Sequence, residues 1–201
     1  RTTLSTYRAQ KRGGKGRAAM SVKDEDFVSQ VFVLNTHDPV LFFTNTGIVY
    51  ELKVYKLPLG NPQAKGRPMV NLLPLSEGEQ VTTMMPLPEN DENPPDLMFA
   101  TKSGNVRRNA LSDFSNVKAN GKIAMKLLEG DALVGVVPCK KNDDIMLSAS
   151  QGKCMRFRSG DVRLFKGRGS VGVRGIRLKK DDEVISISVL KHIEADTEVK
   201  L

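Results

Sequence analysis

Tryptophan is absent from this chain of 201 residues, and cysteine and histidine each occur only twice. Cys139 and Cys154 do not form a CxxC pair, and a zinc site would need more ligands at closer spacing. His37 and His192 are far apart, and no cluster of ligand-type residues surrounds either of them in the sequence. We therefore predict two reduced thiols, no metal site, and no Ser–His or Cys–His catalytic pair.

Long apolar segments are also missing. No run approaches the roughly 18 residues that a membrane-spanning helix needs, and no long basic amphipathic helix is visible. Residues 1–7 lack the apolar core of a signal peptide. These absences predict no membrane partner. Because the chain begins with Arg1 rather than methionine, we also expect a fragment or a processed form.

Positive charge is present in excess. The chain has 31 Lys and Arg residues against 23 Asp and Glu residues, a formal charge of +8 and an isoelectric point near 9.5. This balance indicates a polyanionic partner. Aromatic residues make up 5% and mostly lie in apolar runs such as Phe42–Phe43, so stacking on single strands is not expected. Few side chains suited to base edges accompany the cations, which favours sequence-independent contact with a phosphate backbone.

The densest cationic motif places three basic residues and three glycines within seven positions, Gln10-Lys11-Arg12-Gly13-Gly14-Lys15-Gly16. Glycine lacks a Cβ, so backbone N–H groups can approach an anion closely and φ can be positive. The GxxxxGK[ST] spacing of a nucleotide-binding P-loop is absent. We therefore expect the anion to be a polymer backbone, although a solvated basic turn would have a similar composition.

The chain repeats itself at a period of about 50 residues, which is the first feature to seek in such a sequence. An acidic turn followed by apolar residues recurs at steps of 53, 52 and 51 residues, at Asp26, Glu79, Asp131 and Asp182. An apolar run that ends in a polar turn with glycine recurs at Gly47, Gly104 and Gly152. A small turn with a central glycine beside basic residues recurs four times, at 15–17, 65–67, 120–122 and 166–168.

These marks predict an all-β fold of propeller-like blades. The apolar runs are short, and Val184–Val189 alternates as a half-buried strand does. The three glycines lie where a hairpin turn needs positive φ. We predict about four strands per repeat in one β-pinwheel or propeller-like domain spanning 1–201, with approximate blades 1–38 (partial), 39–94, 95–142 and 143–201. A WD40 propeller is disfavoured because the chain has no tryptophan.

Basic residues recur at similar places in each repeat, so we predict that they form a cationic stripe along the rim of the domain. The alternative is an ordinary solvated surface. The rim residues predicted to contact DNA are Arg8, Arg17, Lys65, Arg67, Arg107, Arg108, Lys118, Lys122, Arg156, Arg158, Lys166, Arg168 and Arg174.

All seven positions at 10–16 conform to the pattern of the gyrase A box, which is Gln, basic, basic, Gly, Gly, basic, Gly. Ser5–Arg8, Asn35–Asp38, Leu41–Asn45 and Tyr55–Leu75 also resemble the C-terminal domain of the DNA gyrase A protein. The resemblance implies a β-pinwheel that binds duplex DNA and wraps it around a basic rim. It assigns DNA contact to the box residues Gln10, Lys11, Arg12, Gly13, Gly14, Lys15 and Gly16.

The resemblance also implies what the chain does within a larger assembly. In that family the wrap directs strand passage, so that the holoenzyme introduces negative supercoils with ATP. The catalytic tyrosine and the ATPase lie elsewhere, since Tyr7, Tyr50 and Tyr55 are not in a matching context. This domain is therefore expected to be non-catalytic and to need no cofactor, with ATP and Mg²⁺ acting elsewhere. The implied partners are duplex DNA, the rest of the gyrase A protein and, through it, the gyrase B protein, in the bacterial cytoplasm at the nucleoid.

Two other interpretations stay open. One is the C-terminal domain of the topoisomerase IV C protein, a relative in which the box is degenerate or missing; the intact box here favours gyrase. The other is a propeller-like scaffold for docking proteins, with the positive charge serving solubility or an acidic partner.

Overall fold

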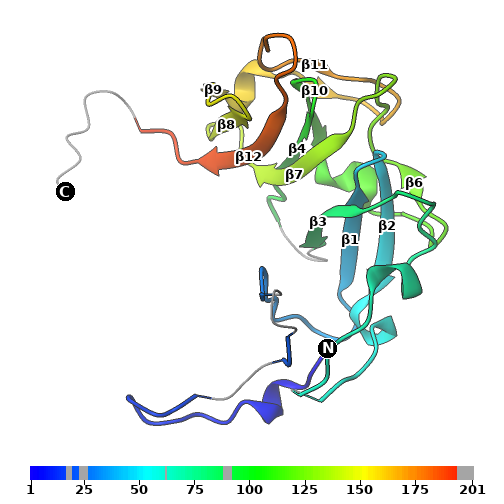
Figure 1. The fold of residues 1–201 in the computed structure, drawn as a ribbon, viewed down its shortest axis with the longest axis vertical. Helices are drawn as coiled ribbons and strands as arrows, with labels where there is room; N and C mark the ends of the chain where they lie inside the picture. Colours follow the sequence, from blue (N-terminus) through cyan, green and yellow to red (C-terminus); the bar gives the residue numbers. More distant parts are fainter. Residues whose placement is uncertain (17–19, 23–26, 62, 88–91, 194–201) are drawn as a thin grey trace.

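The computed structural model describes residues 1–16, 20–22, 27–61, 63–87 and 92–193. Throughout these ranges the regular structure consists of β-strands and short 3₁₀ helices (Figure 1), which confirms the all-β prediction. The strands are β1 (Pro39–Thr44), β2 (Ile48–Lys53), β3 (Val81–Pro86), β4 (Asp96–Thr101), β5 (Asn105–Ala110), β6 (Lys122–Ile123), β7 (Leu133–Cys139), β8 (Asp144–Ala149), β9 (Cys154–Arg158), β10 (Leu164–Phe165), β11 (Val173–Arg174) and β12 (Val184–Leu190). The 3₁₀ helices are η1 (Leu4–Thr6), η2 (Val54–Lys56), η3 (Met69–Asn71), η4 (Leu111–Phe114) and η5 (Ser159–Asp161).

Three antiparallel hairpins, β1–β2, β4–β5 and β8–β9, form the centre of three sheets. In each sheet a later strand, β3, β7 or β12, pairs antiparallel with the first strand of the hairpin. We call β3, β7 and β12 the inner strands, because β7 contacts both β3 and β12 and so joins the sheets. The hairpin turns contain Gly47, Gly104 and Gly152 at φ values of 78°, 87° and 81°, which confirms the predicted turns.

We call the remaining edge of each sheet the outer edge, and in the first two sheets it is completed by the next repeat. In the first sheet β6 pairs with β2, although it follows β4 and β5 in the chain. In the second sheet β5 is covered by β10 in parallel and by β11 in antiparallel orientation. In the third sheet, among the described residues, β9 has no such neighbour. We call residues 115–126 and 162–176 the capping segments. Strands are therefore exchanged between repeats, and no local signal in the sequence predicts this exchange.

Each capping segment is anchored at the glycine of the hairpin turn it meets. The Gly47 carbonyl accepts hydrogen bonds from Ala124 N at 2.8 Å and Met125 N at 3.1 Å. The Gly104 carbonyl accepts in the same way from Gly175 N at 2.9 Å and Ile176 N at 3.2 Å. The approach is so close that a Cβ on Gly104 would lie 2.8 Å from Ile176 Cγ2. Glycine is thus required here by contact between repeats as well as by the turn.

The recurring acidic residues, which lie just before the inner strands, bind the same hairpin turns from the side opposite the capping segments. Glu79 is buried, and its carboxylate accepts hydrogen bonds from the Thr44, Thr46 and Tyr50 hydroxyls and from Ser76 N. Asp131 accepts from the backbone and hydroxyl of Ser103, and Asp182 accepts from the Ser150 hydroxyl and Gln151 N. The period of about 50 residues therefore reports one structural device, an acidic side chain that closes each hairpin turn. The fourth marker, Asp26, lies outside the described residues.

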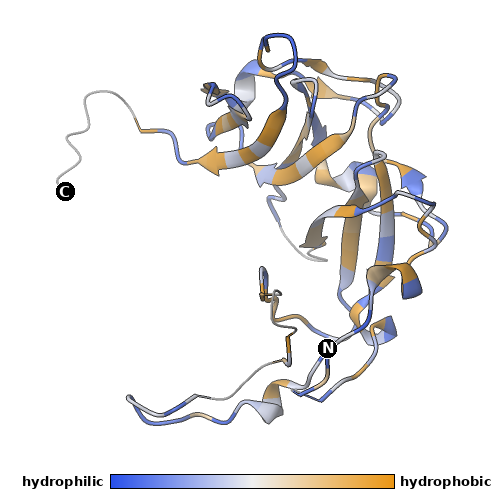
Figure 2. Cartoon of the chain, in the orientation of Figure 1, coloured by the Kyte–Doolittle hydropathy of each residue, from blue (hydrophilic) through white to orange (hydrophobic). Residues whose placement is uncertain are grey.

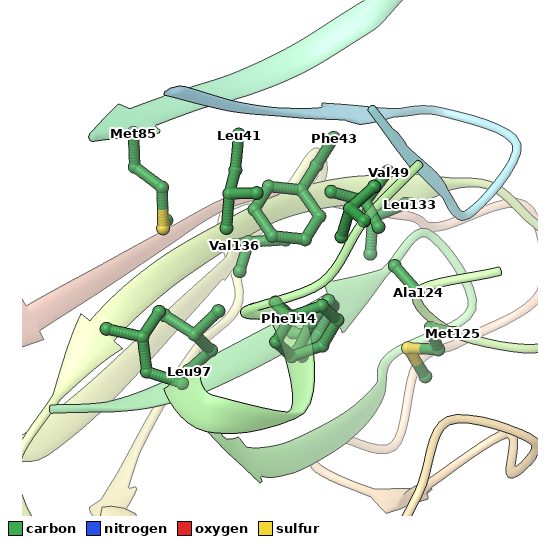
Figure 3. Packing of buried hydrophobic residues seen from close by; sticks show 13 residues of the cluster. Leu41, Phe43, Val49, Met85, Leu97, Phe114, Ala124, Met125, Leu133 and Val136 are labelled. Carbon is green, nitrogen blue, oxygen red and sulfur yellow. The ribbon is translucent and has the colours of Figure 1, made fainter. Parts of the chain in front are cut away.

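The hydrophobic core lies between successive sheets. Leu41 and Phe43 of β1 face the second sheet, while the alternate residues Val40 and Phe42 pack on the opposite face. Figure 3 shows the first of these clusters, where the rings of Phe43, Phe99 and Phe114 lie 5.6–5.7 Å apart. A second cluster joins the second and third sheets. The strands carry most of the apolar residues and the loops most of the polar ones (Figure 2), as a core built from strand faces requires.

The contact between capping segment and hairpin turn is testable with a matched pair of substitutions. Gly104→Ala and Gly152→Ala both place a Cβ at positive φ, but only Gly104 meets a capping segment, since nothing lies within 4 Å of the Gly152 site. Each change should cost about 1–2 kcal/mol from the left-handed backbone. Gly104→Ala should cost a further 1–3 kcal/mol or so from the collision. Equal losses in chemical denaturation would contradict the proposed anchoring.

The Glu79 carboxylate should make the free energy of unfolding depend on pH. Burial alone raises the pKa of Glu79, but its hydrogen bonds to Ser76 N, Thr44, Thr46 and Tyr50 outweigh that effect and hold the pKa below the ordinary 4.5. A lowered folded-state pKa stabilises the fold above the unfolded value, and this stabilisation is lost as pH falls through the folded-state pKa. Glu79→Gln should therefore lower the unfolding free energy by about 2 kcal/mol at pH 7. The difference in unfolding free energy between wild type and variant should become smaller below pH 4.5. A difference that does not change with pH would refute this role.

Candidate nucleic-acid interface

The glycine-rich motif at 10–16 forms a closed, exposed loop. Gly14 N donates to Lys11 O at 3.0 Å, and Gly16 N donates to the side-chain oxygen of Gln10 at 3.0 Å. Gly13 and Gly16 have φ values of 85° and 69°. A Cβ on Gly14 would lie 2.7 Å from the Gln10 oxygen that closes the loop. The Gln and Gly positions of the motif therefore define the loop shape.

The cations of this loop point to solvent. Lys11, Arg12 and Lys15 are all exposed, and none of the ion pairs found in the described ranges involves them. A compact loop with three uncompensated cations is a suitable contact for phosphate groups. Arg8 is exposed just before it, whereas Arg17 lies outside the described residues.

The capping segments carry further cations to the outer edges of the sheets. Lys122 lies in β6 and Lys118 lies just before it, on the outer edge of the first sheet. Lys122 Nζ donates to Asn116 O at 2.8 Å. Lys166 and Arg168 lie in the loop from β10 to β11, and Arg174 lies in β11. All three are on the outer edge of the second sheet. Strand exchange thus places cations of one repeat on the rim of the preceding sheet, opposite the inner strands.

Arg107 and Arg108 do not lie on this rim. Both are buried, with 0% and 7% of their surface exposed. Successive residues of a strand point to opposite faces, yet both side chains are enclosed, Arg107 completely and Arg108 with Nε and Nη1 buried. Arg108 Nε lies 3.8 Å from an Asp96 carboxylate oxygen. We therefore exclude these two arginines from the DNA-contacting set.

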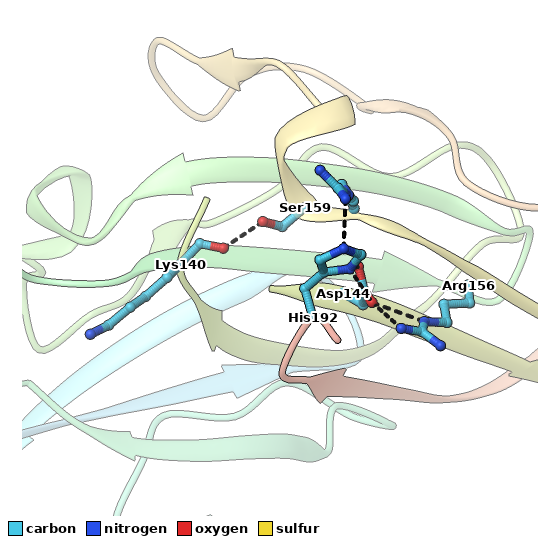
Figure 4. Close-up of polar contacts among 6 residues, drawn as sticks. Lys140, Asp144, Arg156, Ser159 and His192 are labelled. Atoms are coloured by element: carbon cyan, nitrogen blue, oxygen red, sulfur yellow. Dashed lines mark hydrogen bonds and ion pairs between the residues drawn. The ribbon is translucent and has the colours of Figure 1, made fainter. Parts of the chain in front are cut away.

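Arg156 and Arg158 are exposed but engaged with their own sheet (Figure 4). Arg156 donates to the buried Asp144 carboxylate through Nε at 2.9 Å and also through Nη2. His192 Nδ1 lies 3.0 Å from the same carboxylate. These hydrogen bonds, that of Arg156 first and that of His192 second, hold the pKa of Asp144 below its ordinary value. Arg158 can only donate, so His192 Nε2 accepts from it and Nδ1–H donates to Asp144. The positive charge of Arg156 is therefore compensated locally.

The structure does not bring all predicted cations together. Lys65 and Arg67 are exposed in a coil around Gly66, whose φ is 75°. In Figure 1 the N-terminal segment that contains the loop at 10–16 lies at the opposite end of the molecule from β10 and β11, so these cations do not gather at one place.

Other chemistry is sparse. Within the described ranges, no group of three or more His, Cys, Asp and Glu residues could hold a metal ion. Cys139 is a buried free thiol whose pKa is raised to about 12, chiefly by burial, and Cys154 is an exposed free thiol. A search of the same residues for a helix able to cross a lipid bilayer finds none.

Comparison with known proteins gives a consistent match along the chain. A profile described as "DNA gyrase C-terminal domain, beta-propeller" matches residues 1–35, 38–88, 95–140 and 143–191. The DNA gyrase A protein of Rickettsia bellii is 56% identical over 200 residues, which cover 98% of this chain and 22% of that protein. The chain therefore spans about a fifth of the length of the curated relatives that it matches.

Two solved structures share the fold. The crystal structure of the C-terminal domain of DNA topoisomerase IV has a TM-score of 0.82 at 23% identity, covering 95% of this chain and 57% of that one. The structure of a DNA gyrase A C-terminal domain has a TM-score of 0.62 at 26% identity, covering 92% of this chain and 59% of that one. The first likeness, at its low identity, bears on the fold alone. Both confirm the propeller-like prediction.

The loop at 10–16 makes a local prediction. Gln10→Ala removes the acceptor of the Gly16 N–H, and a hydrogen bond of this kind contributes about 0.5–1.5 kcal/mol. Amide exchange at Gly16 should accelerate about 2- to 12-fold by NMR, as that free energy implies. The Gly14 amide, bonded to the Lys11 carbonyl, serves as the control within the same loop. Unchanged exchange at Gly16 would mean that Gln10 does not close the loop.

Proposed function

The chain belongs to the DNA gyrase C-terminal domain family, and from this premise we propose that it binds duplex DNA and bends it around its outer edge. The observation that carries the proposal is the placement of uncompensated cations by the capping segments on two successive sheets. The exposed loop at 10–16 adds a third cationic element. The proposed contact set contains, besides the loop residues, Arg8, Lys65, Arg67, Lys118, Lys122, Lys166, Arg168 and Arg174.

Phosphate contacts can offset the elastic cost of bending. Bending 20–30 base pairs by 40–90° costs about 1–6 kcal/mol. Each phosphate neutralised by Lys or Arg releases counterions and steepens the dependence of log K on log salt by about 0.9. Eight exposed or half-exposed cations outside the loop are more than enough to make binding strongly salt-dependent. Because these side chains are suited to phosphate rather than base edges, binding is largely independent of sequence.

Within a gyrase the bent segment would direct strand passage. The domain then acts without cofactor, while the catalytic tyrosine, the ATPase and their Mg²⁺ and ATP belong to the rest of the gyrase A protein and to the gyrase B protein. The assembly would introduce negative supercoils in the bacterial cytoplasm. We further propose that the sequence repeats end near residues 38, 94 and 142, as predicted. Each capping segment then belongs to one repeat and completes the sheet of the repeat before it.

A topoisomerase IV counterpart is the second candidate, because the C-terminal domains of both enzymes share this fold. The 56% identity to a gyrase A protein and the intact seven-residue motif favour the gyrase function instead. A protein-docking scaffold would be indicated only if salt-sensitive binding to duplex DNA were absent.

Religation of a nicked circle tests the proposal. With the chain bound during ligation, the linking number of the closed circle should change, because a wrapped path is trapped. Lys11→Ala/Arg12→Ala/Lys15→Ala should abolish that change and leave part of the binding. The matched control Lys140→Ala/Lys141→Ala/Lys179→Ala removes the same charge from exposed positions outside the contact set and should keep the change. An unaltered linking number with the wild-type chain would contradict wrapping.

A further inference from the structure

The loop between β10 and β11 is held from beneath by two buried side chains of the preceding repeat. Arg107 and Asn109 of β5 are both 0% exposed and point to the same face of their strand. Arg107 Nη1 donates to Arg168 O at 2.7 Å and to Ser170 O at 2.8 Å. Asn109 Nδ2 lies 3.1 Å from Phe165 O and 2.8 Å from Gly167 O.

These two side chains also fix each other. Arg107 Nε donates to Asn109 Oδ1 at 2.7 Å, and Arg107 Nη2 donates to Ala124 O in the capping segment of the first sheet. The guanidinium carbon lies 5.3 Å from the centre of the Phe99 ring. Arg107 therefore connects its own strand, the capping segment of the first sheet and the loop between β10 and β11.

The backbone carbonyls of the loop point toward Arg107 and Asn109, so the amide groups that follow them point the opposite way. In a trans peptide the N–H points opposite to the preceding C=O. The carbonyls of Gly167, Arg168 and Ser170 point toward Arg107 and Asn109, so the N–H groups of Arg168, Gly169 and Val171 point away from them. No backbone or side-chain acceptor is found for these three N–H groups within the described ranges. Successive outward amides form the kind of concavity that binds anions.

The loop between β10 and β11 carries two cations that form no ion pair with the described residues, while a neighbouring carboxylate, that of Asp113, accepts from Asn109 Nδ2 at 2.8 Å. Lys166 is exposed and Arg168 is half-buried, and no ion pair in the described part of the chain includes either of them. Arg168 Nη1 is itself buried and has no hydrogen-bond partner there, so this donor is left unsatisfied within the protein. Burial lowers the pKa of Arg107 to about 10, which still leaves it charged at neutral pH beneath the loop.

We propose that the loop at 166–171 is a phosphate-binding subsite, in which Lys166, Arg168 and outward amides contact one or two phosphodiester groups, and that Arg107 and Asn109 are its positioning residues. The ligand chemistry is a phosphate oxyanion of the duplex backbone. This subsite rests on the proposed DNA binding, and it assigns a role to buried residues that never touch DNA.

Salt-dependent binding of the full chain to a duplex of about 25 base pairs provides the test. The double variant Lys166→Ala/Arg168→Ala should flatten the slope of log K against log salt by about 1–2, because one or two phosphate contacts are lost. Asn109→Ala removes no charge, yet it should flatten the slope by about 1. The control Lys140→Ala/Lys141→Ala should change the slope by less than either.

A double-mutant comparison separates positioning from general damage. If Asn109 acts through the loop, adding Asn109→Ala to Lys166→Ala/Arg168→Ala should change the slope little further. Full additivity, or an unchanged slope in the double loop variant while wild type stays salt-dependent, would overturn this inference alone. Absence of salt-dependent binding by wild type would overturn the proposed function and the subsite together. Competition by inorganic phosphate at millimolar concentration against wild type but not against the loop variant would assign the subsite to free phosphate and overturn its role in DNA contact.

Discussion

The pair of hydrogen bonds from one repeat to the hairpin-turn carbonyl of the repeat before it is the interaction on which the rest of the structure depends. The carbonyls of Gly47 and Gly104 each accept hydrogen bonds from two backbone amides of a capping segment. A sheet that binds a capping segment is therefore not complete within its own repeat. The same exchange carries Lys118, Lys166 and their neighbours to the outer edge. A packing requirement of the backbone therefore also determines where the positive charge lies.

Polar contacts within and between repeats reinforce this arrangement. The acidic residues Glu79, Asp131 and Asp182 fix the hairpin turns from the side of the inner strands. Arg107, by contrast, is a buried cation whose direct partners are carbonyls and an amide oxygen rather than a carboxylate. Such a charge is costly to bury unless its donors are satisfied, and here they are satisfied by segments of two successive repeats.

Much of this architecture is readable from the sequence, and the limits have physical reasons. The apolar runs and their terminal glycines predict the three hairpins because both signals are local. The acidic markers reveal the period, but not that each one closes a turn about 30 residues away. The exchanged strands β6, β10 and β11 have two residues each, too few for any periodicity. Arg107 and Arg108 follow the pattern of surface cations, although two consecutive strand residues cannot both face outward on one side of a sheet. That rule alone predicts that at most one of the two lies on the rim.

The central proposal is that duplex DNA follows a bent path along the capping segments at the outer edge and also contacts the loop at 10–16. The most direct measurement is energy transfer between dyes at the two ends of a duplex of about 40 base pairs, well below the persistence length of roughly 150 base pairs. The account predicts that binding at low salt shortens the distance between the ends and that added salt restores the free value. Binding that leaves the end-to-end distance at that of the free, straight duplex would contradict it.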